Sequence, residues 1–265
     1  MCIRDRLILL PEYFQGHLTL TLIALSLGVV ISIPLGVWAA QSATVKRPLL
    51  TVVSVIQTFP SVAILALVVA LLGGQIGLVP AIIALVLYSM LPIVRNTVTG
   101  LETVADEVIE AASGIGMSST QILTKVRLPL ALPVIISGIR TAAVWTVGLA
   151  TLSTLVGATS FGNFIFTGLQ TGNLMSVTVG SIAAAIMAVL LDSIIGGIQW
   201  LTENRNRQVP AKKYKQVKFA VIAMLGVGTA FSAYSLLPQT EVDFTIGGKG
   251  SDSYRNLSLP PNREV

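Results

Sequence analysis

The sequence predicts an all-α integral membrane protein, and two observations lead to that fold class. First, the chain has 265 residues, of which 53% are hydrophobic and only 11% are charged, whereas soluble domains carry about 25% charged residues. Second, four long stretches contain no Asp, Glu, Lys or Arg, at residues 13–45, 48–94, 141–191 and 219–240. A water-soluble fold is thereby excluded. A basic nucleic-acid binder is excluded as well, because the net charge of +5 is spread over too few cations to form a binding face.

The charge-free stretches accommodate six membrane-spanning helices. A helix needs about 20 apolar residues to cross the hydrocarbon of a bilayer, and it satisfies its own backbone polar groups where water is absent. Glycine-rich residues 73–77 split the second stretch, and residues 157–173, rich in Gly, Asn and Thr, split the third. The predicted helices are residues 18–40, 50–72, 78–93, 132–156, 174–201 and 218–236.

The positions of the cations predict the orientation of these helices. Most Lys and Arg residues fall after the first, third and fifth helices, and the positive-inside rule places those segments in the cytoplasm. Both termini are then extracytoplasmic, including a short lead-in at residues 1–17. The long segment 95–131 is cytoplasmic.

The segment between the third and fourth helices has the most informative pattern. Apolar residues recur at helical spacing over residues 101–112, acidic residues occupy the other face, and Gly114 and Gly116 end that helix. Residues 118–121 resemble a capping box that opens a second short helix, which Leu128-Pro129 ends. Such a helical hairpin either inserts into a groove of a partner protein or rests on lipid headgroups.

This segment resembles the EAA loop of binding-protein-dependent ABC transporter permeases. The family pattern is E-A-A, three residues, G, nine residues, I, one residue and L-P, and the sole departure here is valine in place of isoleucine. The matching residues are Glu110, Ala111, Ala112, Gly116, Val126, Leu128 and Pro129. Three further stretches, residues 56–61, 91–96 and 138–146, resemble the osmoprotectant branch of the family, which imports glycine betaine, choline or carnitine. The resemblance extends over residues 12–204.

The resemblance implies a type I ABC importer permease core of five helices (MetI-like) at residues 18–201, with the EAA loop at 99–131 and a sixth C-terminal transmembrane helix in addition. The chain would be a subunit of an ATP-driven importer and not itself an enzyme. In the family, the loop docks in a groove of a cytoplasmic ATPase, whose closure on ATP swings the permease between inward- and outward-facing states. Small Ala111 and Ala112 would allow close approach, and Gly116 would supply the turn.

The same resemblance implies the partners. They are a cytoplasmic ABC ATPase dimer, a second permease copy that is identical or different, an extracytoplasmic substrate-binding protein or fused binding domain, and the bilayer of a bacterial or archaeal cell membrane. No cofactor is expected on this chain, because ATP and Mg belong to the ATPase. Residues 247–250 lack the first glycine and the Ser or Thr of a phosphate-binding loop. Because specificity in the family resides mainly in the binding protein, another small solute is the alternative.

Two charged residues fall in the interior of predicted spans. Arg140 and Asp192 lie at matching depths in the fourth and fifth helices, and each alone would cost about 2.5–3.5 kcal/mol on insertion scales. Opposite sign and equal depth favour a structural ion pair that joins the two helices. A gate element or a proton relay is the alternative role.

Aromatic residues and prolines are the candidates for a solute pathway. Phe59 and Trp145 would meet a quaternary ammonium through cation–π contact, and Pro60 would kink its helix. Packing or lipid contact is the alternative for both aromatic rings. His17, alone at the start of a helix, is predicted to be interfacial. No catalytic motif is found, and a single cysteine, Cys2, excludes a disulfide framework and a cysteine-rich metal site, so no metal is expected.

The C-terminal part divides into three segments. Residues 202–217 form a basic cytoplasmic linker, residues 218–236 the extra helix, and residues 237–265 a short extracytoplasmic tail. The alternation at residues 242–249 resembles the first strand of a fused substrate-binding domain, so the tail is a truncated domain, a relic or a disordered end. The competing functional class is an ion-coupled secondary carrier, which would show two related halves; no such repeat is found.

Overall fold

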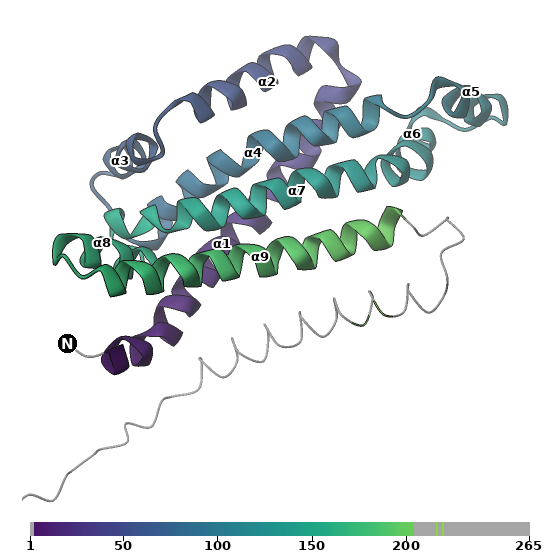
Figure 1. Cartoon of the computed structure of the whole chain (residues 1–265). Helices are drawn as coiled ribbons and strands as arrows, with labels where there is room; N and C mark the ends of the chain where they lie inside the picture. The colour runs from purple at the N-terminus through teal and green to yellow at the C-terminus, as the bar shows by residue number, and fades with distance from the viewer. Residues whose placement is uncertain (1–2, 204–215, 217–218, 220–265) are drawn as a thin grey trace, which may run out of the picture.

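The structure, a computed structural model, describes residues 3–203 together with residues 216 and 219, and for residues 3–9 the backbone alone. This part of the chain contains helices and no strand (Figure 1). The helices are α1 (Ile3–Gln41), α2 (Ala43–Thr58), α3 (Ser61–Leu71), α4 (Leu78–Glu102), α5 (Asp106–Gly114), α6 (Ser119–Ile122), α7 (Leu128–Ala150), α8 (Gly162–Gln170) and α9 (Leu174–Glu203). A π-helical turn, Leu123–Arg127, joins α6 to α7, and a 3-10 helix, Leu152–Val156, follows α7.

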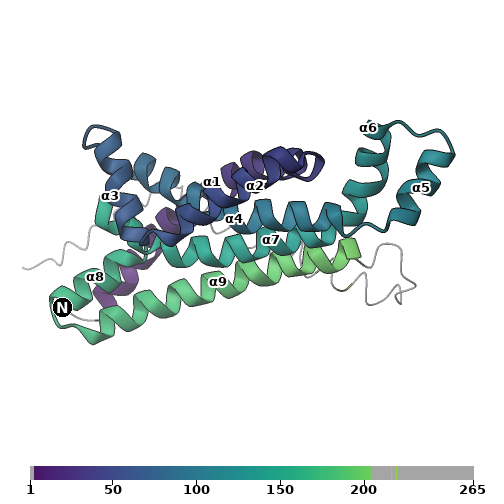
Figure 2. The ribbon, with the colours of Figure 1, turned by 90° about the horizontal axis from the view of Figure 1, so that it is seen from above.

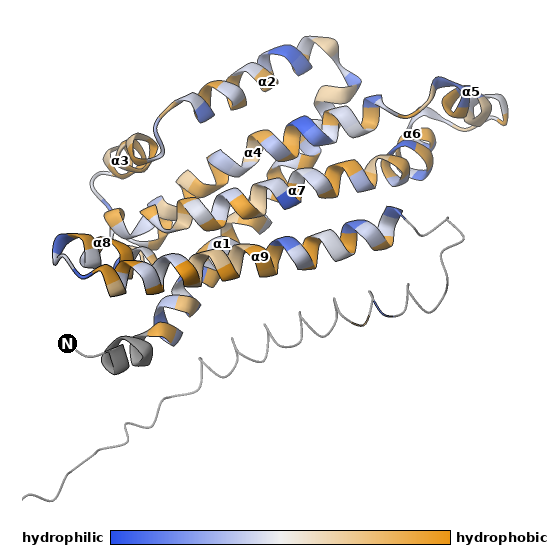
Figure 3. Ribbon diagram, in the orientation of Figure 1, coloured by the Kyte–Doolittle hydropathy of each residue, from blue (hydrophilic) through white to orange (hydrophobic). Residues whose placement is uncertain are grey.

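Among the described residues, four helical segments are long and apolar enough to cross a membrane, and the bent pair α2 and α3 provides a fifth span if it is counted as one. The four segments are Leu10–Gln41, Leu78–Glu102, Ser119–Ala150 and Leu174–Glu203. Hydrophobic residues predominate along α1 and α9, whereas hydrophilic residues gather around α5 and α6 (Figure 3). The predicted sixth helix at 218–236, the linker at 202–217 and the tail at 237–265 lie almost entirely outside the described residues.

The first helix is longer than the sequence predicts. Helix α1 begins at Ile3, so residues 3–17 continue the helix instead of forming a separate lead-in. Leu10, Tyr13 and Phe14 pack against a buried cluster that includes Phe164 of α8. Charged residues at positions 4–12 excluded this part from the predicted span, but helix formation needs no charge-free sequence when apolar side chains on one face have a packing partner.

The prediction of a single helix at residues 50–72 is wrong, because Pro60, which was predicted to kink this helix, breaks it in two. Helices α2 and α3 meet at an angle of 103° at Phe59-Pro60. Proline lacks the N–H that would continue the helix, and it biases the preceding residue toward extended backbone. Phe59 accordingly has φ −70° and ψ 140°.

The prediction that Leu128-Pro129 ends a short helix is also wrong. The chain is helical without interruption from Ser119 to Ala150. Pro129 lies in the first turn of α7, directly after the π-helical turn, and a wider turn accommodates the bond that a proline cannot make. The capping box at the start of this helix is confirmed: Ser118 N–H donates to Gln121 Oε1 at 2.9 Å, and Gln121 N–H donates to Ser118 Oγ at 3.4 Å.

Small residues allow the long helices to pack closely. Helix α1 packs on α4, α4 on α7 and α7 on α9. A Cβ on Gly28 of α1 would lie 2.2 Å from Ser89 Oγ of α4, and a Cβ on Gly138 of α7 would lie 2.7 Å from the carbonyl oxygen of Pro92. Without hydrophobic driving force between helices in lipid, such close backbone approach is a main source of association.

His17 is buried, and its prediction as an interfacial residue is wrong. Its side chain has no exposed surface. The ring Nδ1 accepts a hydrogen bond from Phe161 N–H at 3.2 Å, so the neutral ring carries its proton on Nε2, which donates to the Val147 carbonyl at 3.1 Å. His17 therefore ties α1 to α7 and to the residue that precedes α8.

Substitution of two glycines of α7 tests the close packing of α4 and α7. Gly138→Ala should lower stability by about 1–3 kcal/mol, because its Cβ would overlap backbone and Asn96. Gly148→Ala is the matched control: its Cβ has no neighbour within 4 Å, and alanine should leave the helix unchanged or stabilise it by up to about 1 kcal/mol. Thermal unfolding in detergent measures both. Equal midpoints for the two variants would contradict this packing.

Candidate functional site

The hairpin of α5 and α6 lies at one end of the helical bundle. Figure 2 shows α5 and α6 beyond the ends of α4, α7 and α9. Residues 103–105 separate α4 from α5, so the amphipathic stretch predicted at 101–112 is two helices and not one. Since α7 continues directly from α6, the hairpin is rigidly connected to a membrane-spanning helix.

A glycine-dependent turn ends α5. Gly116 has φ +85°, a backbone conformation that residues with a Cβ rarely adopt. Met117 N–H donates to the Ala112 carbonyl at 3.2 Å, and Gly116 N–H donates to the Ser113 carbonyl at 2.9 Å. This pair of bonds is a Schellman motif with glycine at its left-handed position.

The predicted EAA-loop residues separate into a tip and a base. At the tip, Glu110, Ala111 and Gly116 are exposed, whereas Ala112 is buried. At the base, the partly buried Leu128 packs against the cluster of Leu101, Ala131 and Ile135. Val126 is partly buried in the π-helical turn and Pro129 is exposed.

One residue of the tip escaped prediction from the pattern. Ile115 is 80% exposed, although it is among the most hydrophobic residue types. The sequence feature that could have indicated this exposure is the position of Ile115 between Gly114 and Gly116 in a polar segment. The tip therefore presents an apolar side chain beside a backbone turn.

The structure brings Arg140 of α7 and Asp192 of α9 together. The guanidinium donates Nε–H to Asp192 Oδ1 and Nη2–H to Oδ2, the latter at 2.6 Å. The side chains are 43% and 31% exposed. They line a cavity of about 370 Å³ together with Ser137, Thr141, Val144 and Trp145. Whether the pair is structural or gates a pathway stays a prediction.

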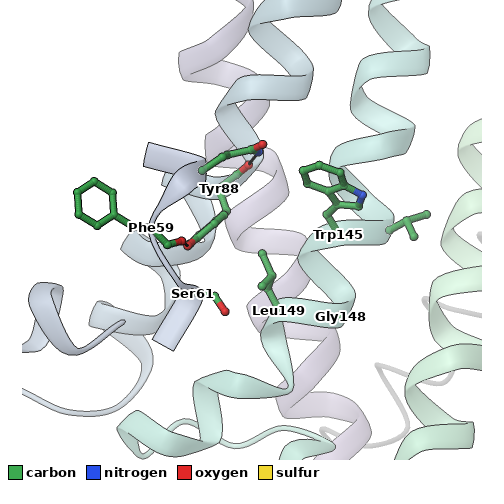
Figure 4. A pocket seen from close by; sticks show the side chains of 8 residues that line it. Phe59, Ser61, Tyr88, Trp145, Gly148 and Leu149 are labelled. Carbon is green, nitrogen blue, oxygen red and sulfur yellow. Dashed lines mark hydrogen bonds between the residues drawn. The ribbon is translucent and has the colours of Figure 1, made fainter. Parts of the chain in front are cut away.

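A larger cavity is also lined by Trp145. Its volume is about 560 Å³, and its lining residues are Gln57, Phe59, Ser61, Tyr88, Val144, Trp145, Gly148 and Leu149. None of these side chains is charged. Figure 4 shows the Trp145 ring on the side facing Tyr88, and the Phe59 ring directed away from Trp145. Of the two predicted aromatic residues, Trp145 therefore has the better placement for a ligand; Pro60 forms the bend beside the cavity.

Helix α2 is tied to α4 at both of its ends. Near its start, Lys46 Nζ donates to the Glu102 carboxylate at 2.6 Å. At the bend, Tyr88 Oη–H donates to the Phe59 carbonyl at 2.5 Å, and Gln57 Nε2–H donates to the Tyr88 carbonyl at 2.9 Å. The bond from Tyr88 satisfies the Phe59 carbonyl at the break, and the bond from Gln57 satisfies the Tyr88 carbonyl of α4, whose helical partner would be Pro92, a residue without an N–H. Sequence patterns assign no role to Tyr88 or to Gln57, which lies in the stretch 56–61, because their bonding partners are distant in sequence.

The described residues contain no group of three or more His, Cys, Asp or Glu side chains placed to hold a metal ion.

A double-mutant cycle tests the ion pair. Arg140→Gln or Asp192→Asn alone leaves one charge without its partner and should destabilise the protein by about 2–3 kcal/mol, the order of the insertion cost of such a charge. The double variant should lose less than the sum of the single losses. Thermal unfolding of the four purified proteins in detergent gives the coupling energy. Additive losses would show that the two side chains do not stabilise one another.

Comparison with known proteins identifies relatives along most of the chain. Residues 32–208 match the family described as binding-protein-dependent transport system inner membrane component. The choline transport system permease protein OpuBB of Bacillus subtilis is 41% identical over 179 residues, which are 68% of this chain and 82% of the relative. The osmoprotectant import permease protein OsmW of Salmonella typhimurium is 36% identical over 186 residues, 69% of this chain and 86% of the relative.

Solved structures show the same fold. The MetNI methionine ABC transporter, in inward-facing conformations, matches with a TM-score of 0.67 at 23% identity, over 76% of this chain and 99% of that one. An amino acid ABC transporter matches with a TM-score of 0.58 at 19% identity, over 77% and 99%. The chain therefore belongs to the binding-protein-dependent transport system inner membrane components, the membrane permease subunits of ABC importers.

Proposed function

We propose that this chain is the permease of an ATP-driven importer for quaternary-amine osmoprotectants of the glycine betaine, choline and carnitine type. A partner ATPase hydrolyses ATP, and the permease alternates between inward- and outward-open states together with a second permease copy and an extracytoplasmic binding protein. Support for the solute class comes from the relatives, which are named as choline, glycine betaine/carnitine/choline and osmoprotectant permeases at 36–41% identity.

The observation that carries the coupling mechanism is the exposed tip of the α5–α6 hairpin. Ile115 is 80% exposed, and covering an apolar side chain gains about 25 cal/mol per Å². Gly116 allows a close approach of a partner's backbone beside it. A groove on the partner ATPase would bury Ile115 and contact the backbone at Gly116 in this way.

The charge of α5 favours a protein groove over lipid headgroups. The helix carries Asp106, Glu107 and Glu110 and no Lys or Arg. Helices that lie on membrane surfaces are rich in Lys and Arg, because the cytoplasmic leaflet is negatively charged and attracts cations. An acidic helix is repelled from that surface, whereas a protein groove with basic residues would attract it.

Uptake by the reconstituted importer tests the solute class. Proteoliposomes that contain the permease, its ATPase and its binding protein should accumulate labelled glycine betaine, carnitine or choline only when ATP is supplied. Liposomes without the ATPase should accumulate none. Transport by the permease alone, or failure to carry any quaternary amine, would contradict the proposal.

Variants at the tip test the coupling. Gly116→Ala should lower ATP-dependent uptake several-fold, because a Cβ at φ +85° strains the turn by about 1–2 kcal/mol. Gly114→Ala is the control, since its Cβ meets no atom within 4 Å. Glu110→Lys, which reverses an exposed charge, should also lower uptake. Membrane insertion of all three, measured by quantitative blotting, should match the unchanged protein; full transport by Gly116→Ala and Glu110→Lys would refute the coupling role.

A further inference from the structure

The two cavities share one wall. Val144 and Trp145 of α7 line both the cavity of about 370 Å³ and the cavity of about 560 Å³. Thr141, Trp145 and Gly148 recur at helical spacing, so a single face of α7 runs along both. A small solute in contact with Trp145 is therefore within reach of the lining of each cavity.

In the cavity of about 370 Å³, Arg140 has hydrogen-bond donors that its ion pair with Asp192 does not use. A guanidinium has five N–H donors, and Asp192 accepts from Nε and Nη2 of Arg140. Nη1 donates no hydrogen bond to any other described residue, and the Arg140 side chain is 43% exposed. The edge formed by Nη1 and Nη2 has the fork geometry that a carboxylate accepts.

The other cavity suits a cation that cannot donate hydrogen bonds. No charged side chain lines it, and Trp145 is 49% exposed. Indole is the best aromatic partner for an ammonium, including a quaternary one. The Trp145 ring faces the space between α7 and Tyr88 (Figure 4).

Charge balance distinguishes the solutes. Arg140 and Asp192 together carry no net charge, so a solute with a single charge adds to the site a charge that has no partner there. A zwitterion adds a positive and a negative group together, and here each has its own partner. Choline brings the ammonium only and leaves the Arg140 edge empty.

We infer that Trp145 and Arg140 of α7, together with Asp192 of α9, form a membrane-embedded site for zwitterionic quaternary amines. The carboxylate of the solute accepts from the free edge of Arg140, its trimethylammonium group lies against the Trp145 ring, and Asp192 fixes the orientation of the Arg140 guanidinium. The inference rests on the proposed function and adds that the permease itself distinguishes solutes with a carboxylate from those without.

Transport by the complete importer in proteoliposomes tests this site. The binding protein is saturated with labelled glycine betaine, carnitine or choline, so that rates report the membrane step. The double variant Arg140→Gln with Asp192→Asn should lower transport of glycine betaine and carnitine about tenfold relative to choline, the value of a lost charged hydrogen bond. Should this variant fail to fold, Arg140→Lys serves in its place, because it keeps the charge and loses the fork.

Aromatic variants test the ammonium contact in the same assay. Trp145→Leu should lower transport of all three solutes about fivefold, and Trp145→Phe should retain most of it. Trp38→Leu is the control, because Trp38 is 58% exposed on α1 and lines neither cavity; it should leave transport unchanged.

The possible outcomes distinguish failure of the proposed site from failure of the proposed function. Equal losses for choline and the zwitterions in the charge variants, or equal losses for Trp38→Leu and Trp145→Leu, would overturn the site. An unchanged importer that carries choline and neither zwitterion would overturn the site and leave the proposed function standing. An unchanged importer that carries none of the three would overturn both.

Discussion

The close contact of α7 with α4 is the constraint on which both candidate sites depend. Gly138 lets the α7 backbone approach Pro92 so closely that a Cβ would lie 2.7 Å from its carbonyl oxygen. The α5–α6 hairpin connects these two helices, and α7 continues from the hairpin as one helix from Ser119 to Ala150. Arg140 and Trp145 therefore lie on the same continuous helix as the second half of the hairpin, with no loop between them.

The opposite wall of the larger cavity, formed at the junction of α2 and α3, is held together by a different kind of bond. It contains the 103° break at Phe59-Pro60, where backbone groups have lost their helical partners. Tyr88 donates to the Phe59 carbonyl at the break, and Gln57 donates to the Tyr88 carbonyl, so side-chain bonds join α2 to α4 there. The bend is thus held by side-chain bonds, whereas α7 is held by its own backbone hydrogen bonds.

Sequence reasoning located the features that follow from the bilayer itself. Charge-free stretches predicted the positions of the spans at α1, α4, α7 and α9, since the cost of a charge in lipid restricts where charges occur. The same cost of a charge in lipid indicated that Arg140 and Asp192 pair with one another, and the two side chains are in contact. The capping box at Ser118 was visible because its partners are three residues apart.

Features set by tertiary contacts could not be predicted in this way. The bend at Pro60 was predicted, but Pro129 was predicted to end a helix and does not, because the π-helical turn before it accommodates the proline. His17 looked interfacial because its partners, Val147 and Phe161, are more than 100 residues away. The EAA pattern located the loop but not the exposure of Ile115. In a membrane protein, the positions of the spans can thus be predicted from sequence, because the bilayer restricts where charged residues occur. Bends and polar contacts, which shape the candidate sites, depend instead on contacts between helices that are distant in sequence.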